Sequence, residues 1–290
     1  MQVDLDKTNR AYFVLNAENR KFIQQYPIGD RDRVLSTYPK CGVSWIQHII
    51  WLIVRHGQLD RGARQSFDNY YIDMVGPKLL DTVRRDDPHG RDVIVIKTHI
   101  RSDRLPFHRR RTKYLTVLRN PKDVCLSLYS HIAGLYPRVF RLLEPLGLFR
   151  LYFWLWTTFS VVDYFQSALY YWRQRTDPNH TVLIYEDMVR NPRDNIRRIA
   201  QYLGDDYLSR LDKQCPDGDR DELLIDRIVR MSAVKEMKQF HGDDIHVRKG
   251  VVGTWRDRLT RAQSDTIDRK AELTWFGTEL ETLWEREMEW

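Results

Sequence analysis

The feature that most constrains the fold is a repeated pairing of a short, β-rich apolar run with a helical pattern. Successive apolar positions within such runs are typical of strands that are buried on both faces. The four runs occupy residues 34–38, 93–97, 114–118 and 181–185. Strands of this kind alternating with helices predict a central parallel sheet flanked by helices on both sides. Ligands of such sheets bind beyond the carboxyl ends of the strands, where the connecting loops lie.

Cap and turn signals mark the helices that should follow the strands. An apolar helical pattern starts near Ser44 and stops at Gly57. Asn120-Pro121 combines a capping side chain with proline at the first helical position. Asn191-Pro192 opens a further helix that should close at Gly204. Because no repeat, low-complexity linker or composition shift divides the 290 residues, we expect one α/β domain.

Charge and composition narrow the classes of partner. Apolar residues make up 42% of the chain and charged residues 30%, which predicts a packed core. The net charge of +7 indicates an anionic partner: nucleic acid, an anionic membrane surface or a small ligand with several phosphates. Basic residues are scattered among nearly as many acids rather than concentrated on one element, so no nucleic-acid partner is expected.

Cysteine usage and hydropathy bear on the compartment. The three cysteines form no recognisable framework or metal pair, which fits a reducing compartment; they are Cys41, Cys125 and Cys215. The N-terminal segment has no apolar stretch, so neither a signal peptide nor a membrane anchor is expected. The most apolar segment, residues 148–165, is interrupted by Arg150 and Asp163 and falls short of the ~20 residues that span a bilayer. We interpret it as buried core or pocket wall and predict a cytoplasmic protein with no membrane partner.

The loop after the first strand reads TYPKCGVSW, residues 37–45. Gly42 lets the backbone approach an anion closely, and the first free amides of the following helix point at it. Lys40 adds a positive charge and Ser44 a hydroxyl. On these residues alone an ordinary turn with an exposed lysine is an equally good interpretation, because one glycine is a weak signal. The nucleotide-kinase loop G-x-x-x-x-G-K-[ST] does not occur in the sequence.

This loop resembles the phosphosulfate-binding loop of the cytosolic sulfotransferase family, which is usually close to TYPKSGTTW. Three further segments resemble motifs of that family, in the same order. They are the segment that holds the 3′-phosphate, residues 117–127, the YEDM…NP stretch, residues 185–192, and the C-terminal RKGxxGxW signature, residues 248–255. The resemblance covers most of the chain and implies a P-loop-kinase-like sulfotransferase fold as a single domain over residues 1–290.

The resemblance also implies a donor, 3′-phosphoadenosine 5′-phosphosulfate (PAPS), with adenosine 3′,5′-bisphosphate (PAP) as product. The phosphosulfate would be held by Lys40, Cys41, Gly42, Val43, Ser44 and Trp45. The 3′-phosphate would be held by Arg119, Ser127, Arg248, Lys249 and the amide of Gly250, arginine offering fork geometry to a phosphate. Adenine should stack on aromatic side chains; the matching positions are Trp45, Tyr185 and Ser232.

Lys97-Thr98-His99 closes the second predicted strand and resembles the KTH motif of the family. Sulfuryl transfer requires a nucleophilic oxygen that loses its proton, and histidine titrates close to neutrality. His99 is therefore predicted to be the general base. Lys40 would stabilise charge on the bridging oxygen of the donor, with Lys97 as a secondary electrostatic helper. No metal is expected, because no His/Cys cluster is seen and cationic side chains supply the charge.

The sequence departs from the family pattern at several places. Residues 41–44 lack hydroxyls that the family often places on the phosphosulfate, and Val234 stands where the family has a phenylalanine opposing adenine. The connection from 234 to 248 looks short, which predicts a reduced gate. In the segment matching the dimer motif, residues 256–265, Arg261 replaces a central valine, which predicts a monomer or weak dimer. Cys41 at a helix start beside Lys40 is expected to favour the thiolate.

Two other classes of function stay open at this point. One is a nucleotide or small-molecule kinase on a related phosphate-binding fold, which would need a kinase loop and a magnesium carboxylate. The other is a non-catalytic protein that grips heparin-like anions. The hydroxyl acceptor itself is expected to be small: residues 152–172 and 70–80 either line a site for an apolar alcohol, phenol or sterol, or are simply core.

Overall fold

The structure is a computed structural model, and it describes residues 17–59, 70–86, 92–107, 112–158, 163–215, 222–241 and 250–290. In these ranges four parallel strands form a sheet in the order β2-β1-β3-β4. Their bounds are Asp32–Ser36 (β1), Ile94–Thr98 (β2), Lys113–Leu118 (β3) and His180–Ile184 (β4). Ser36 is level with Thr98, and Leu118 with Ile184, so the carboxyl ends of paired strands meet at one edge.

The four predicted strands all exist, each displaced by no more than two residues. The largest displacement is in β1, which begins at Asp32 rather than Val34. Its polar start is accommodated because Arg33 donates hydrogen bonds to the carbonyls of Tyr202 and Leu203. Thr37 leaves the sheet and donates its hydroxyl proton to the carbonyl of Val117 at 2.7 Å. The predicted parallel α/β sheet is thus confirmed.

The helices that directly follow β1, β3 and β4 also match the sequence signals. Their bounds are Val43–Val54 (α2), Pro121–Leu135 (α6), Tyr185–Arg190 (α10) and Pro192–Leu203 (α11). The Asn120 side chain caps α6 by accepting from the amide of Asp123, and Pro121 and Pro192 each begin a helix. The α2 helix stops three residues before Gly57, because a turn with His56 and Gly57 at positive φ follows it.

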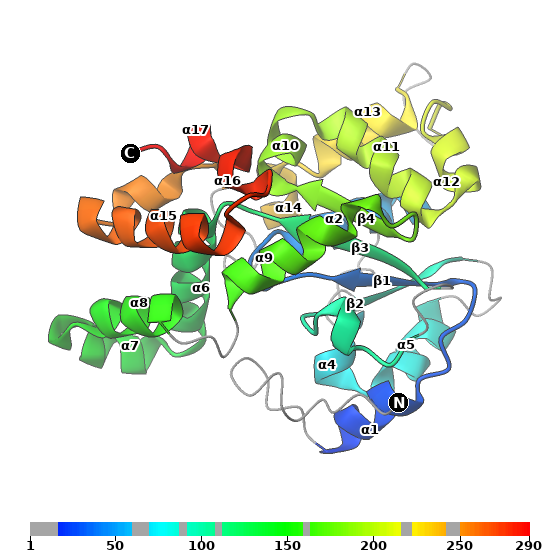
Figure 1. The fold of residues 1–290 in the computed structure, drawn as a ribbon. Helices are drawn as coiled ribbons and strands as arrows, with labels where there is room; N and C mark the ends of the chain where they lie inside the picture. Colours follow the sequence, from blue (N-terminus) through cyan, green and yellow to red (C-terminus); the bar gives the residue numbers. More distant parts are fainter. Residues whose placement is uncertain are drawn as a thin grey trace.

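The remaining helices surround the sheet (Figure 1). Near the β2 edge lie α1 (Ala17–Gln25), α4 (Ile72–Val75) and α5 (Lys78–Asp86), and near β4 lie α12 (Asp205–Arg210) and α13 (Leu224–Met231). Helix α9 (Tyr164–Arg173) contacts β3 and α15 (Arg261–Trp275), and α14 spans Val234–His241. The C-terminal helices are α16 (Leu280–Leu283) and α17 (Glu285–Met288), and short 3₁₀ turns span 102–104, 144–146, 174–176 and 254–257.

Residues 148–165 were interpreted as buried core or pocket wall, and the buried-core interpretation is wrong for the first part. Helix α7 (Pro137–Leu143) and helix α8 (Leu148–Thr158) form a hairpin that stands away from the sheet (Figure 1). Within α8 only Phe153 is buried. Its apolar side chains encircle the helix, and the body of the protein can cover only one side of such a helix. The chain turns into α9 at Asp163, whose carboxylate caps that helix.

Candidate active site

The carboxyl edge of the sheet gathers the loops that the sequence singled out. The loop 37–42 follows β1, His99 follows β2, Arg119 follows β3 and Tyr185 follows β4. Because the four strands are parallel, these residues from distant parts of the chain meet at one edge. The structure therefore brings together the predicted base and the predicted donor-binding loop.

Two residues of this loop adopt left-handed backbone conformations. Lys40 has φ 66°, which is uncommon for a side chain of its kind, and Gly42 has φ 109°. A Cβ atom on Gly42 would lie 2.9 Å from Cδ2 of Tyr185, so glycine is required by close packing as well as by conformation. Helix α2 then starts at Val43 without a side-chain cap. The loop thus presents the first amides of α2 toward the sheet edge, an arrangement that favours anions.

The expectation of a reactive Cys41 is wrong. Its side chain is fully buried, and burial raises the pKa of the thiol. The nearby Arg119 acts in the opposite direction but does not overcome burial. The position at a helix start suggested a thiolate, yet the turn directs this side chain into the core, where the charged form loses its hydration.

Arg119 lies under the loop with most of its surface buried. Its Nη1 donates to the carbonyl of Lys40 at 3.4 Å, its Nη2 is 3.7 Å from the Asp123 carboxylate, and its guanidinium carbon lies 4.2 Å from the centre of the Tyr185 ring. Its Nε is buried and has no hydrogen-bond partner among the described residues. A buried cationic donor without an acceptor fits the binding of an anion from outside the chain.

The residues predicted to border adenine lie close together. The rings of Trp45 and Tyr185 meet edge to face with centroids 5.5 Å apart. The Trp45 Nε1 donates to the carbonyl of Ser232 at 3.0 Å, which fixes the indole. The hydroxyl of Ser232 donates to the carbonyl of Val229, so the backbone of this serine rather than its side chain meets Trp45. Val234 packs against Gly250, where an added Cβ would lie 2.0 Å from Cγ2 of the valine.

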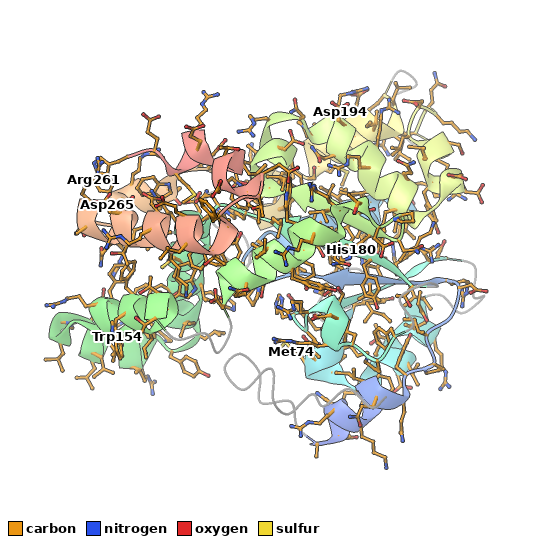
Figure 2. The ribbon with its side chains drawn as sticks, viewed as in Figure 1. Met74, Trp154, His180, Asp194, Arg261 and Asp265 are labelled. Carbon is orange, nitrogen blue, oxygen red and sulfur yellow. The ribbon has the colours of Figure 1, made fainter. Side chains whose placement is uncertain are left out.

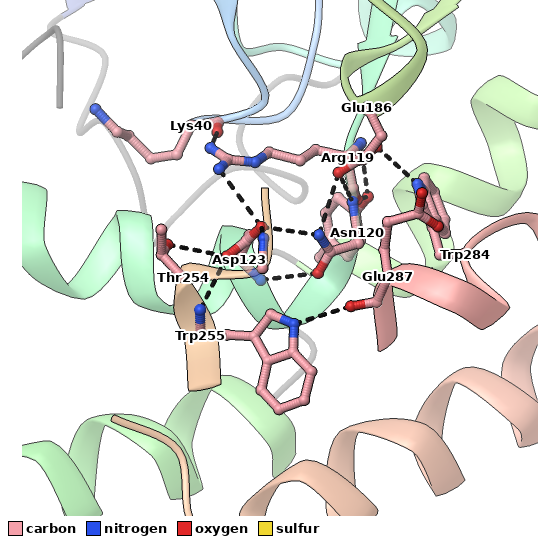
Figure 3. A network of polar contacts seen from close by, with 11 residues as sticks. Lys40, Arg119, Asn120, Asp123, Glu186, Thr254, Trp255, Trp284 and Glu287 are labelled. Carbon is pink, nitrogen blue, oxygen red and sulfur yellow. Dashed lines mark hydrogen bonds and ion pairs between the residues drawn. The ribbon is translucent and has the colours of Figure 1, made fainter. Parts of the chain in front are cut away.

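Arg248 and Lys249 of the C-terminal signature lie outside the described residues, as does the second half of the expected short gate, residues 242–247. The part that is described is bound to the start of α6 through Asp123 (Figure 3). The amides of Gly253 and Trp255 donate to the Asp123 carboxylate at 2.8 and 3.1 Å, and the Thr254 hydroxyl donates at 3.1 Å. The signature therefore sits against the 3′-phosphate segment, on which the buried Ser127 also lies.

Two more buried charges hold this segment in place. Glu186 accepts from the Asn120 amide at 3.0 Å and from the Trp284 indole at 2.8 Å, and burial raises its pKa (Figure 3). The ammonium group of Lys122 donates to Ser264 at 2.6 Å and to Asp268 at 2.9 Å, and it also reaches the carbonyl of Met288. Distant parts of the sequence thereby fix one turn of α6.

His99 is held in a defined tautomer. Its Nδ1 lies 2.9 Å from the carbonyl of Thr37, which can only accept, so Nδ1 carries the proton. Its Nε2 then has a free lone pair and accepts from the Tyr71 hydroxyl at 2.9 Å. Burial, together with the charges of Lys97 and Lys40, lowers the pKa of His99 to about 4. The imidazole is consequently neutral at physiological pH, as a proton acceptor must be.

Lys97 and the segment 70–80 were predicted at this site, but the role of Asp73 beside His99 was not predicted from the sequence. The Asp73 carboxylate accepts from the His99 amide at 2.7 Å and from the Thr98 hydroxyl at 2.5 Å, and burial raises the pKa of Asp73 to about 6. Lys97 is fully buried with its Nζ 4.0 Å from the centre of the Tyr71 ring. The available signal was Asp73, an acid within an otherwise apolar run that starts at Tyr70.

In the described parts of the chain, no three or more histidine, cysteine or acidic side chains cluster in a way that could hold a metal ion. Within those same ranges, every helix is too short or too polar to cross a membrane. The site so defined is an edge of a parallel sheet at which a cationic loop, a buried arginine and a neutral histidine converge. This is the architecture of an enzyme that acts on a multiply charged anion.

Comparison with known proteins gives the family. The family model of the Sulfotransferase domain matches residues 30–280, and the chain belongs to the sulfotransferase family. It is 27% identical to human Sulfotransferase 1C2, with 87% of this chain and 85% of that protein covered, and 27% identical to mouse Sulfotransferase 1B1, with 93% and 90% covered. The chain is thus a transferase, the predicted family is confirmed, and the kinase alternative is not favoured.

Solved structures show the same fold. A mouse sulfotransferase, SULT7A1, complexed with PAP has a TM-score of 0.68 at 20% identity, with 95% of each chain covered. Retinol dehydratase in complex with androsterone and the inactive cofactor PAP has a TM-score of 0.65 at 19% identity, with 90% of this chain and 86% of that chain covered. The predicted sulfotransferase fold is confirmed, and PAPS, the sulfuryl donor of this family, is confirmed as the cofactor.

Proposed function

We propose that the chain, as one domain, transfers a sulfuryl group from PAPS to the hydroxyl of a small apolar acceptor. The observation that carries this proposal is the hydrogen bond between His99 and the carbonyl of Thr37. Thr37 is the first residue of the donor loop, so the base is tied directly to the loop that would hold the phosphosulfate. The bond also leaves Nε2 as the nitrogen that can take a proton.

The residues at the sheet edge fit the donor. Arg119 would complete its hydrogen bonding on the 3′-phosphate through the Nε that lacks a partner in the described structure. The amides of residues 43–45 and the charge of Lys40 would meet the phosphosulfate, and Trp45 would border the adenine ring. The Gly250–Trp255 turn, fixed by Asp123, would bring the amide of Gly250 to the 3′-phosphate.

The chemistry requires one proton to leave the acceptor hydroxyl. PAPS supplies the sulfuryl group: a new S–O bond forms to the acceptor oxygen as the bond to the bridging oxygen breaks. His99 Nε2 would take the released proton, and burial together with the charge of Lys97 beside Tyr71 keeps the imidazole neutral until then. Lys40 would stabilise the negative charge that appears on the leaving oxygen. When an acceptor binds, the Tyr71 hydroxyl must either move away from His99 Nε2 or relay the acceptor's proton to Nε2.

Single substitutions test these roles. Lys40→Ala and His99→Ala should each lower kcat by roughly a hundredfold or more, the usual loss for charge stabilisation or a general base. Calorimetric titration with PAP should show weaker binding only for the lysine variant. His56→Ala, which removes an exposed histidine, is the matched control. Near-normal turnover of His99→Ala at saturating donor would falsify the assignment of the base.

The acceptor class rests on the aromatic surroundings of His99. Tyr71 lies against its ring, with centroids 5.1 Å apart, and Tyr70 precedes it on the same segment. The solved complex of retinol dehydratase with androsterone supports an apolar acceptor for this chain as well. Transfer assays with radiolabelled donor and a panel of phenols, sterols, catecholamines and sugars should identify the acceptor. Preference for sugars, or heparin binding that ignores PAP and survives His99→Ala, would contradict the proposal.

A further inference from the structure

The hairpin of α7 and α8 exposes an unusual amount of apolar surface. Of the fourteen large apolar side chains that are strongly exposed among the described residues, eight lie between 135 and 155. Of these eight, the most exposed are Leu146 at 80% and Leu142 at 73%. Figure 2 shows Trp154 on this hairpin, away from the sheet, and its side chain is 51% exposed. Exposed apolar side chains gathered on one hairpin in this way are typical of a surface that binds something apolar.

Helix α8 is apolar on two opposite sides. Toward the body, Phe149 and Tyr152 pack on Tyr129 with ring centroids 4.9 and 5.0 Å apart, and Trp156 packs on Phe165. The other side carries Leu151, Trp154 and Leu155, which face away from that packing and are exposed. The inner side anchors the hairpin, whereas the three side chains of the outer side are each 44–53% exposed to water.

The charges around this surface are of one sign. Arg138, Arg141 and Arg150 are all exposed. Between residues 136 and 158 the acidic residue is Glu144, which is paired with Arg258 and accepts from the Tyr129 hydroxyl. The outer face therefore combines leucine and tryptophan with exposed arginines that form no ion pair with another described residue. An anionic lipid surface complements both properties at once.

A second copy of the chain complements the apolar side chains and arginines of this face less well. Two such faces packed together would bring six arginines into one interface, where like charges repel. A bilayer instead receives Leu142, Leu146 and Trp154 among its acyl chains while the arginine side chains reach the phosphates above. The protruding shape of the hairpin (Figure 1) also suits insertion into a soft surface.

We propose that the α7–α8 hairpin docks this protein on anionic lipid bilayers. Helix α8 has 11 residues and would lie in the plane of the interface, so docking needs no membrane-spanning segment. No membrane partner was expected from the sequence, because only a spanning helix or an anchor would have indicated one. The proposal does not depend on the sulfotransfer reaction or on the acceptor.

Flotation of the full chain with lipid vesicles tests the proposal. We expect binding to phosphatidylcholine vesicles that contain about 30% phosphatidylserine and much less to phosphatidylcholine alone. Leu151→Ser with Trp154→Ser should lower the partition coefficient at least tenfold. Arg138→Ser with Arg141→Ser should lower it by roughly tenfold or more, since each arginine near an anionic surface contributes about 1 kcal/mol.

The matched control is Leu273→Ser with Phe276→Ser, two side chains on and just after α15 that are 76% and 83% exposed. This control should leave vesicle binding unchanged, and all variants should keep their PAP affinity and melting temperature because the substituted side chains are exposed. The proposal is overturned by any of three results. They are no binding to anionic vesicles, undiminished binding by the Leu151/Trp154 variant, and a dimer in light scattering that this variant abolishes.

Discussion

Replacing Asp123 by asparagine probes how the C-terminal signature is held at the donor site. Its carboxylate, fully buried, is surrounded by donors. One oxygen, Oδ2, faces the Gly253 amide, the Asn120 side chain and Arg119, and the other, Oδ1, faces the Trp255 amide and the Thr254 hydroxyl. An asparagine side chain must turn an NH₂ group toward one of these two sets.

The less costly orientation places the NH₂ group at Oδ1. There the Thr254 hydroxyl can reverse its role and accept, but the Trp255 amide is left without an acceptor. One buried orphaned donor costs about 1–3 kcal/mol, and the remaining bonds lose the assistance of the negative charge. We therefore expect a loss of about 2–4 kcal/mol in the free energy of unfolding, or roughly 3–7 °C in Tm for a chain of this size.

Thermal unfolding and calorimetric titration with PAP measure the two consequences. The Gly250–Trp255 turn would no longer be fixed against Arg119, so PAP affinity should fall at least tenfold. The control is Thr254→Val, which removes a single hydroxyl donor at 3.1 Å and should cost about 1 kcal/mol. If Asp123→Asn melts within two degrees or so of the parent chain and binds PAP equally well, the network in Figure 3 does not hold the signature.

Three further predictions follow from buried groups. Tyr71→Phe removes the donor to His99 Nε2 but keeps the ring under Lys97. Because the Thr37 carbonyl still orients the imidazole, kcat should fall only about tenfold and PAP affinity should be unchanged. A loss as large as that of His99→Ala would show instead that Tyr71 carries the proton. Burial lowers the pKa of His48 to about 4, below the ordinary 6.5, so the unfolded chain takes up the proton first as pH falls and stability is lost between about pH 6.5 and 4. Urea unfolding at pH 7.5 and 5 should show His48→Gln losing about 2 kcal/mol less than the parent chain, and equal losses would refute the lowered pKa. Cys41, Cys125 and Cys215 are all buried and form no disulfide bond, so iodoacetamide should label none of them in the native protein. Mass spectrometry that finds rapid labelling of Cys41 would restore the thiolate hypothesis.

What the sequence predicted well was local. Strand positions, the Asn120-Pro121 helix start and the glycine of the donor loop each depend on a few neighbouring residues, and the structure has them within two positions. The convergence of His99, Lys40 and Arg119 followed from the rule that parallel strands end at one edge. The roles proposed for these residues remain predictions, as do the cytoplasmic location and the monomeric state suggested by Arg261, which is paired with Asp265 in the same helix.

What the sequence could not predict depends on contacts between distant residues or on the direction of a side chain. Asp123 was within a recognised motif, but its bond to Gly253 spans 130 residues. The position of Cys41 at a helix start was predicted, but the direction of its thiol was not. The thiol points inward because of the turn made by Lys40 and Gly42. In α8, apolarity alone could not tell a core helix from a surface helix, because both sides of the helix are apolar.

The buried ammonium group of Lys122 has a consequence for co-translational folding on the ribosome. Its partners are Ser264, Asp268 and Met288, which are 142, 146 and 166 residues later in the chain. A chain emerging from its N-terminus cannot pair this charge until residues 264–288 have been synthesised. The sheet can assemble earlier, since β4 ends at Ile184. The first turn of α6 therefore stays incompletely ordered until then, and the nascent chain should gain the capacity to hold its nucleotide only after residue 288 has emerged.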